Sequence, residues 1–406
     1  MAEENARTAD IIVIGGGIAG LATAMALSGQ GLSIVVMEAR ELAAAPPHTG
    51  DRAEDYDSRV SALTPRSMAF LGDLGAWPLI AAQRHCPYHH MTVWDAEGTG
   101  RIEFDAAEAG AGQLGSIVEN RLITAALAER VRTAPDVQLL TSVQPTAVDA
   151  GGDTIVITLA DDERWSCELL VAADGALSRT RDMLGLRTRE WDYGHRAIVT
   201  TARFERVHEH TAWQRFLPTG PLALLPLAGG EDRLCSIVWS IEEAQAEPLL
   251  ALNSDDFASA LTQASEHTLG RVSCCAERRA FPLRQRHAVD YVAPGVALVG
   301  DAAHTIHPLA GQGVNLGLAD VQTLAAELSS ARQRGLGPGR IEVLRRYQRQ
   351  RKGENLAMMA AMDGFKRLFE QSSPPVRWLR NSGMRAVGSL PSLKRRIIRE
   401  AMGVLP

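Results

Sequence analysis

The sequence predicts an α/β fold in which a Rossmann-like nucleotide-binding domain carries an inserted, mainly antiparallel β-sheet domain and ends in helices. Three observations lead to this prediction. A glycine-rich turn near the start joins a short apolar run to a helical pattern, residues 191–281 alternate apolar with polar side chains and lack such turns, and a helical period runs from residue 341 to residue 370. A length of 406 residues also favours two domains over one.

Composition narrows the class of protein. A hydrophobic content of 46% and a charged content of 22% are typical of soluble enzymes, and a net charge of −6 argues against nucleic acid as the main partner. No apolar run approaches the roughly 18–20 residues that cross a bilayer. The five cysteines have no metal-ligand spacing, so we expect reduced thiols and no metal site. The acidic start does not resemble a signal peptide, and we expect a cytoplasmic protein.

The first glycine-rich turn predicts a dinucleotide site. It has the G-x-G-x-x-G pattern between a strand at residues 11–14 and a helix, and an acidic residue ends the following strand about 20 residues later, where it suits ribose hydroxyls. The motif does not separate FAD from NAD. The residues expected to bind the cofactor here are Gly15, Gly17, Ile18, Ala19, Gly20 and Glu38.

A second turn, at Gly300–Gly317, connects a strand at residues 296–299 to a helix that starts near Asn315. Asp301, directly after the strand, can accept hydrogen bonds from a polyol. The turn into the helix aims free backbone N–H groups and the positive end of the helix dipole at an anion or an electron-rich ring. The residues of this turn are Gly311, Gln312, Gly313, Val314 and Asn315.

Two further segments suggest contacts with a nucleotide. Arg59 precedes a helix that should begin at Thr64 and Pro65, so it either reaches a pyrophosphate or is a surface arginine. Asp174 and Gly175 form another turn after a strand, which predicts a second nucleotide-contacting acid.

The C-terminal segment is basic and amphipathic. Residues 376–400 contain seven Lys and Arg residues against one acid, Glu400, with apolar side chains between them. This pattern is typical of a helix that lies on an anionic membrane or docks a partner, and equally of a helix packed on its own domain.

Together these motifs resemble the group A flavoprotein aromatic hydroxylases, which share the fold of para-hydroxybenzoate hydroxylase. Within that group, Gly300–Gly317 is similar to the ubiquinone-biosynthesis hydroxylases, as are residues 57–63, 117–120, 281–283 and 347–352. Residues 94–95, 191–193 and 234–240 look most like the branch that hydroxylates 2-polyprenylphenol at ring C5. Hydroxylation at C1 or C6, a soluble aromatic substrate, and a flavin-fold binding protein without redox chemistry are the alternatives.

The resemblance implies a noncovalent FAD that is reduced by NAD(P)H and reacts with O2 to a flavin C4a-hydroperoxide. The first glycine turn and Glu38 would hold the ADP half, Arg59 the pyrophosphate and Asp301 the ribitol. Asn120 and the turn from Gly311 to Asn315 would lie near the flavin, with the carbonyl of Pro308 facing the substrate. Asp174 and Gly175 would contact FAD and the path of the reductant.

The resemblance also implies a domain division and partners. We expect an FAD-binding domain at residues 1–85, 106–185 and 283–370, a substrate domain at 86–105 and 186–282, and the basic segment at 371–406. A polyprenylphenol-type lipid would be the substrate. The basic segment would bring the enzyme to the inner face of the membrane or to other ubiquinone-biosynthesis proteins. His195, His304 and His307 are candidate bases by residue type, but we assign no catalytic residue.

Overall fold

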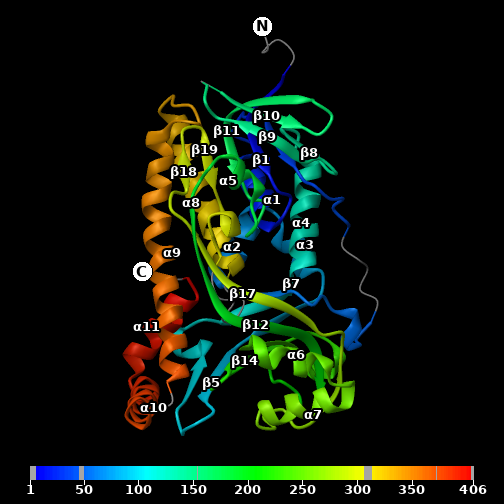
Figure 1. Cartoon of the computed structure of the whole chain (residues 1–406), viewed down its shortest axis with the longest axis vertical. Helices are drawn as coiled ribbons and strands as arrows, with labels where there is room; N and C mark the ends of the chain where they lie inside the picture. Colours follow the sequence, from blue (N-terminus) through cyan, green and yellow to red (C-terminus); the bar gives the residue numbers. More distant parts are fainter. Residues whose placement is uncertain (1–5, 45–49, 153, 306–312, 372, 404–406) are drawn as a thin grey trace.

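The computed structural model describes residues 6–44, 50–152, 154–305, 313–371 and 373–403. Two large sheets occupy opposite ends of an elongated molecule, and a long helix runs along one side (Figure 1). The α/β prediction, with a Rossmann-like part, an inserted mainly antiparallel sheet and C-terminal helices, is confirmed.

An eight-stranded sheet forms one end of the molecule. Its main path runs β18-β19-β11-β1-β2-β8, and the neighbours from β19 to β8 pair in parallel. The hairpin of β9 and β10 extends it from β11. The bounds are β1 Arg7–Ile14, β2 Ile34–Met37, β8 Val137–Leu140, β9 Pro145–Asp149, β10 Ile155–Leu159, β11 Arg164–Ala172, β18 Val292–Ala293 and β19 Val296–Leu298.

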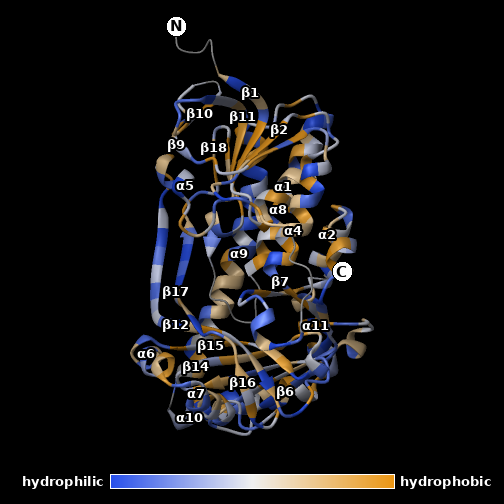
Figure 2. Cartoon of the chain, turned by 90° about the vertical axis from the view of Figure 1, so that its right-hand side faces the viewer, coloured by the Kyte–Doolittle hydropathy of each residue, from blue (hydrophilic) through white to orange (hydrophobic). Residues whose placement is uncertain are grey.

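Both faces of this sheet are buried, which explains the continuous apolar runs of its strands. Ile11 and Val13 of β1 belong to a core shared with the helices, whereas Ile12 and Ile14 belong to a core shared with the β9–β10 hairpin. Figure 2 shows these strands as the hydrophobic centre of this end. The helices of the first core are α1 Ile18–Leu27, α2 Pro65–Asp73, α3 Trp77–Ala81, α4 Asn120–Thr133, α8 Gly313–Gln333 and α9 Ile341–Glu370.

Local signals explain where several of these elements begin. The Thr64 side chain caps α2 by accepting from the Ser67 N–H at 3.2 Å, and Pro65 occupies the first turn, as predicted. The predicted bounds of α9 are also confirmed. A separate three-stranded sheet consists of β3 Val60–Leu63, β7 Gly115–Glu119 and β4 His85–Tyr88.

A nine-stranded sheet forms the other end, and of the strand pairs among its described residues only β13–β5 is parallel. The outer face of this sheet packs on α7, and α6 contacts two of its strands. Its strands and these helices are β5 His90–Asp95, β6 Arg101–Asp105, β12 Thr188–Phe204, β13 Thr211–Leu217, β14 Gly220–Pro226, β15 Leu234–Glu242, β16 Val272–Cys275, β17 Arg279–Ala288, β20 His304–Thr305, α6 Glu243–Ala251 and α7 Ser254–Ala264.

The hairpin of β5 and β6 thus pairs with β13, which follows it by about a hundred residues in the chain. Strands β12 and β17 form a long ribbon that extends toward the first sheet (Figure 1). Much of this ribbon is hydrophilic (Figure 2). The expected domain boundaries remain a prediction, although β17 itself runs across the position expected for one of them, between residues 282 and 283.

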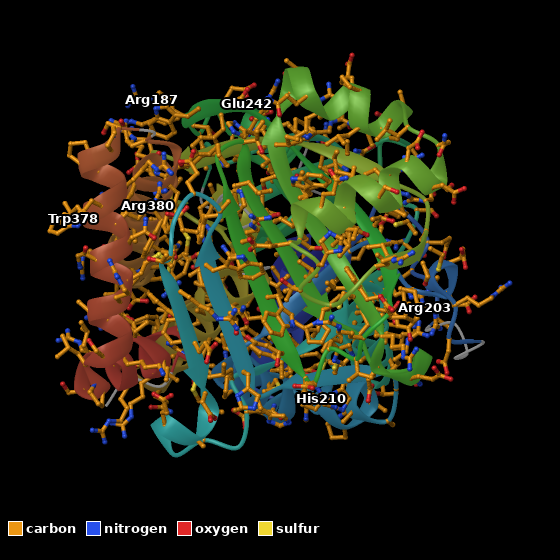
Figure 3. The ribbon with its side chains drawn as sticks, turned by 90° about the horizontal axis from the view of Figure 1, so that it is seen from below. Arg187, Arg203, His210, Glu242, Trp378 and Arg380 are labelled. Atoms are coloured by element: carbon orange, nitrogen blue, oxygen red, sulfur yellow. The ribbon has the colours of Figure 1, made fainter. Side chains whose placement is uncertain are left out.

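The C-terminal segment forms two helices, α10 Pro374–Ser389 and α11 Pro391–Ala401, rather than one. On its inner face, Arg380 is buried and its Nε donates to Asp95 Oδ2 of the β5–β6 hairpin at 2.7 Å. Lys394 pairs with Glu108 of the turn Ala106–Ala109 at 2.5 Å. Trp378 points away from the body of the molecule (Figure 3). One face of the basic segment therefore packs on its own chain.

Candidate cofactor and substrate site

A cleft of about 880 Å³ lies between the two large sheets. The carboxyl ends of β1, β2 and β11 open into one side of it, and the inner face of the nine-stranded sheet forms the other. Of the residues expected to bind the cofactor, those that line the cleft are Gly15, Gly17, Ile18, Ala19, Glu38, Arg59, Asn120, Asp174, Gly175, Asp301, Gly313 and Val314. Gly20 and Asn315 lie beside it, and Pro308, Gly311 and Gln312 fall outside the described residues, as does His307.

The glycines of the first turn have different tasks. Gly15 adopts a φ of +109°, and a Cβ there would lie 2.5 Å from the Ala173 carbonyl oxygen. A Cβ at Gly20 would lie 1.8 Å from the Gly15 carbonyl oxygen, so Gly20 permits close packing of α1 on the turn. Gly17, the N-cap of α1, has no atom within 4 Å of its Cβ position. The start of α1 therefore presents open backbone to the cleft, which suits a pyrophosphate.

Glu38 stands at the end of β2 with room for a further ligand. Its Oε2 accepts from the Gly16 N–H at 2.5 Å, and its Oε1 accepts from the Arg40 N–H at 3.0 Å. A carboxylate has about four acceptor positions, so both oxygens can accept again. This geometry suits a pair of ribose hydroxyls.

The Asp174 carboxylate, by contrast, is used by its own turn. It accepts from Ser178 Oγ at 2.5 Å and from the N–H and Oγ1 of Thr180 at 3.0 and 2.9 Å. Gly175, with a φ of +86°, is open on its Cβ side. The acid fixes the turn, and the backbone beside it faces the cleft.

Asp301 is the acid best placed for a polyol. Its side chain is exposed to the cleft, and its carboxylate has no hydrogen-bond partner among the described residues. Although the side chain is accessible from the cleft, the protein around the cleft partly desolvates the carboxylate and raises the pKa of Asp301 above its ordinary value, against the opposing charges of His304 and Arg59. Hydrogen bonds from hydroxyl groups would stabilise this unpaired carboxylate, so the site fits the ribitol of a flavin dinucleotide.

The two asparagines differ in what they contact. Asn120 lines the cleft, and its Oδ1 accepts from Ser61 Oγ at 2.6 Å. Asn315 is buried at the start of α8, where its Oδ1 accepts from the Thr64 N–H at 3.0 Å and its Nδ2 donates to the Ala62 carbonyl at 2.8 Å. The Asn315 amide thus ties α8 to the junction of β3 and α2.

A buried polar network behind Gly300 escaped the sequence prediction. Asp320 of α8 is fully buried and accepts from the Gly300 N–H at 3.1 Å, from His304 Nε2 at 2.5 Å and from Arg351 Nε at 2.8 Å. Burial alone would raise the pKa of Asp320, but His304 and Arg351 hold it below its ordinary value. The sequence did contain a signal for this network, because Asp320 is a charged residue within the apolar stripe of its helix. His304 therefore lies in this network and does not line the cleft, and the His195 Nδ1 contacts the Tyr193 carbonyl at 2.6 Å.

The opposite wall of the cleft is mostly apolar. The nine-stranded sheet supplies Ala197, Val199, Leu225, Ser236, Val238, Phe281, Pro282, Leu283 and Arg284. A flat ring can lie against this wall while a dinucleotide occupies the polar side. The arrangement can bring a redox ring next to an aromatic substrate and shield both from water.

No group of side chains suited to a metal ion occurs in the described part of the chain. Its helices also include none that is both long and apolar enough to span a bilayer.

Comparison with known proteins agrees with this geometry. The family model for the FAD binding domain matches residues 8–361. The chain is 37% identical to the 3-demethoxyubiquinol 3-hydroxylase of Escherichia coli (97% of this chain and 98% of the relative). It is 36% identical to the ubiquinone hydroxylase UbiL of Rhodospirillum rubrum (98% and 90%), and 35% identical to the human ubiquinone biosynthesis monooxygenase COQ6 (96% and 91%).

Solved structures show the same fold. The p-nitrophenol 4-monooxygenase PnpA of Pseudomonas putida superimposes with a TM-score of 0.77 at 19% identity, over 98% of both chains. The PqsL protein of Pseudomonas aeruginosa, in complex with 2-aminobenzoylacetate, gives a TM-score of 0.76 at 20% identity, over 94% of this chain and 100% of that one.

Proposed function

We propose that this chain hydroxylates the ring of a polyprenylated phenol at C5, ortho to the phenol oxygen. The chain belongs to the FAD-binding ubiquinone-biosynthesis hydroxylases. The chain is an FAD-dependent monooxygenase that uses NAD(P)H as reductant and O2 as co-substrate. The observation that supports hydroxylation of a ring substrate is the cleft itself, which joins a polar wall suited to a dinucleotide to an apolar wall on the second sheet.

The residues present fit FAD. In the proposed complex the N-terminus of α1 and Glu38 bind the ADP half, Arg59 faces the pyrophosphate, and Asp301 accepts from the ribitol hydroxyls. FAD supplies the activation of O2 when it is bound and reduced. The protein would position the ring and exclude water, and the start of α8, where Gly313 and Val314 line the cleft, would direct the positive end of its dipole toward the bound cofactor.

A second ring position has its own support. The E. coli relative is named for hydroxylation of 3-demethoxyubiquinol, and its identity of 37% is similar to that of UbiL and COQ6, at 36% and 35%. The C5 proposal depends instead on the residues at 94–95, 191–193 and 234–240. Hydroxylation at C6 is therefore the second candidate.

Mass spectrometry of quinone intermediates in a deletion strain separates these candidates. Accumulation of polyprenylphenol supports C5, accumulation of a demethoxyquinone supports C6, and a methoxylated intermediate without the C1 hydroxyl points to C1. A quinone pool that does not change would refute a role in ubiquinone biosynthesis.

We also propose that the outer face of the C-terminal helices meets an anionic membrane, where a polyprenyl substrate is dissolved. Trp378 and Leu379 are 69% and 62% exposed, and Arg385, Arg395 and Arg396 are exposed close by in the sequence. Exposed arginines and an exposed aromatic side chain on these two helices suit an anionic lipid surface.

Charge reversal tests the membrane proposal. Arg395→Glu combined with Arg396→Glu should lower cosedimentation with phosphatidylglycerol vesicles several-fold and leave bound FAD unchanged. Uncharged phosphatidylcholine vesicles are the matched control. Equal binding of both proteins to both kinds of vesicle would contradict it.

A further inference from the structure

The apolar wall of the cleft contains one buried hydroxyl with no partner. Ser236 of β15 is 1% exposed, and its Oγ has no hydrogen-bond partner among the described residues. A buried polar atom is normally paired, so an orphaned one requires an explanation. Because Ser236 also lines the cleft, a ligand there can provide the missing partner.

The alternation of β15 places this side chain on the cleft side of the sheet. Val238, two residues along the strand, lines the cleft as well, whereas Cys235 and Ile237 are buried in the core on the other side with α7. Across the strands, Ser236 pairs with Leu225 of β14, which also lines the cleft. On the other side, Ser236 pairs with Thr201 of β12. The hydroxyl thus lies among Leu225, Val238 and Thr201 on the cleft side of the sheet.

The charges on this wall favour a neutral ligand. Arg284 is the cation that the sheet contributes to the lining, and its Nε and Nη1 lie 3.1 and 3.3 Å from the carboxylates of Asp192 and Glu190. The other arginines of the cleft, Arg40, Arg59 and Arg179, come from the nucleotide-binding half. A carboxylate lying against the apolar wall would therefore lack a free cation there, whereas a phenol would not need one.

We propose that Ser236 binds the phenol oxygen of the substrate and positions the ring, and that this subsite takes a neutral phenol that carries no carboxylate. Ser236 is a substrate-positioning residue, and its assignment rests on the proposed hydroxylation of a phenol. A serine hydroxyl both donates and accepts, so it can pair with the phenol in either direction.

The test measures ligand binding to the FAD-loaded protein without reductant, from the change in flavin absorbance on titration. The probes are 2-prenylphenol, prenylbenzene, which lacks the oxygen, and 3-prenyl-4-hydroxybenzoate, which adds a carboxylate. The proteins are the wild type, Ser236→Ala, Ser236→Thr, which retains a hydroxyl, and Ser240→Ala as a control farther along the same strand.

In the wild type we expect 2-prenylphenol to bind about fivefold to tenfold more tightly than prenylbenzene, the gain of one hydrogen bond. It should also bind more tightly than 3-prenyl-4-hydroxybenzoate, because the added carboxylate meets no free cation on the apolar wall. Ser236→Ala should remove the advantage over prenylbenzene and leave prenylbenzene itself within about twofold. Ser236→Thr should keep most of that advantage, and Ser240→Ala all of it.

A stability measurement separates this role from a structural one. Because the Ser236 hydroxyl makes no bond in the ligand-free protein, Ser236→Ala should not lower the Tm, whereas loss of a structural hydrogen bond would lower it by about 2 °C or more. A lower Tm, or equal weakening of 2-prenylphenol and prenylbenzene, would overturn the assignment. Tighter binding of the carboxylated probe by the wild type would overturn the neutral-ring part.

Failure of the proposed function looks different. If the wild type hydroxylates 2-prenylphenol but Ser236→Ala binds it normally, the function stands and the role of Ser236 is wrong. If the wild type neither binds nor hydroxylates any prenylated probe, the proposed function fails and the assignment fails with it. Mass spectrometry of the product with NADPH and O2 reports hydroxylation independently of the titration.

Discussion

Replacement of Asp320 by asparagine tests whether the buried network behind Gly300 holds the cofactor site in place. Asp320 and Arg351 are 0% and 2% exposed, so the variant leaves the Arg351 guanidinium buried beside a neutral amide. Removal of one partner of a buried ion pair costs about 3–5 kcal/mol. The exposed Glu354, which still pairs with Arg351, lowers this cost, and we expect a loss of about 3 kcal/mol in the free energy of unfolding.

The same variant should weaken FAD binding. The Gly300 N–H donates to the Asp320 carboxylate at 3.1 Å, and the next residue is Asp301, which faces the cleft. If the loss of this hydrogen bond weakens the free energy of FAD binding by about 1.4 kcal/mol, the Kd for FAD rises about tenfold. Urea unfolding followed by circular dichroism measures the stability, and titration of the FAD-free protein with FAD measures the Kd.

A control on the same helix separates the network from helix propensity. Glu327 is half-buried and accepts from Gln350 Nε2 at 2.7 Å in an exposed hydrogen bond, so Glu327→Gln should change the stability by less than about 1 kcal/mol. If Asp320→Asn costs no more than this control and binds FAD normally, the network does not hold the turn and the reasoning is wrong.

The acid side of the stability profile gives a second readout. His304 and Arg351 hold the pKa of Asp320 below its ordinary value of 3.8. Because this pKa is lower in the folded than in the unfolded chain, the unfolded chain binds the proton more readily. The stability that the Asp320 carboxylate contributes is therefore present above pH 3.8 and is lost as the pH falls through the folded pKa. Asp320→Asn should lack this part of the acid unfolding.

Three further substitutions have defined outcomes. Arg380→Ala leaves the buried Asp95 carboxylate without its cation, so it should lower the free energy of unfolding in urea by about 3–5 kcal/mol. The control Arg385→Ala, at an exposed position, should lower it by less than about 0.5 kcal/mol. Similar losses in the two variants would contradict the buried pair. Asp301→Asn should weaken FAD binding at least about tenfold, yet raise the Tm of the FAD-free protein at neutral pH, because the raised pKa shows that the folded state disfavours the charge. That rise should vanish near pH 3, where the acid is protonated in both states. Gly20→Ala places a methyl 1.8 Å from the Gly15 carbonyl oxygen, so the purified protein should lack FAD and its yellow colour; a yellow variant with full FAD content would refute the packing argument.

The sequence predicted well what local chemistry determines. Thr64 and Pro65 marked the start of α2, and the spacing of Gly15, Gly17 and Gly20 marked the turn into α1, because caps and glycine turns depend on neighbours in the chain. These signals do not require knowledge of the tertiary fold.

It could not predict which polar groups meet across the fold. Asp320 pairs with Arg351 of the next helix, and the Ser236 hydroxyl is significant only because the strands around it leave it unpaired. Arg380 counted as one charge of a basic tail until the structure placed it against Asp95. Pairings of this kind are decided by tertiary packing, which a periodic pattern does not contain.

The contact between Arg380 and Asp95 has a consequence for the order of synthesis. The two residues are 285 positions apart, and Asn381 also contacts the hairpin, through the Gly100 N–H at 2.5 Å. At about 5–20 residues per second, a ribosome needs on the order of 15–60 s to produce the partner after the acid emerges. For that time the Asp95 carboxylate of the β5–β6 hairpin lacks its cation. Helices α10 and α11 therefore pack on a hairpin that was translated much earlier, and a chain truncated before α10 should depend on chaperones.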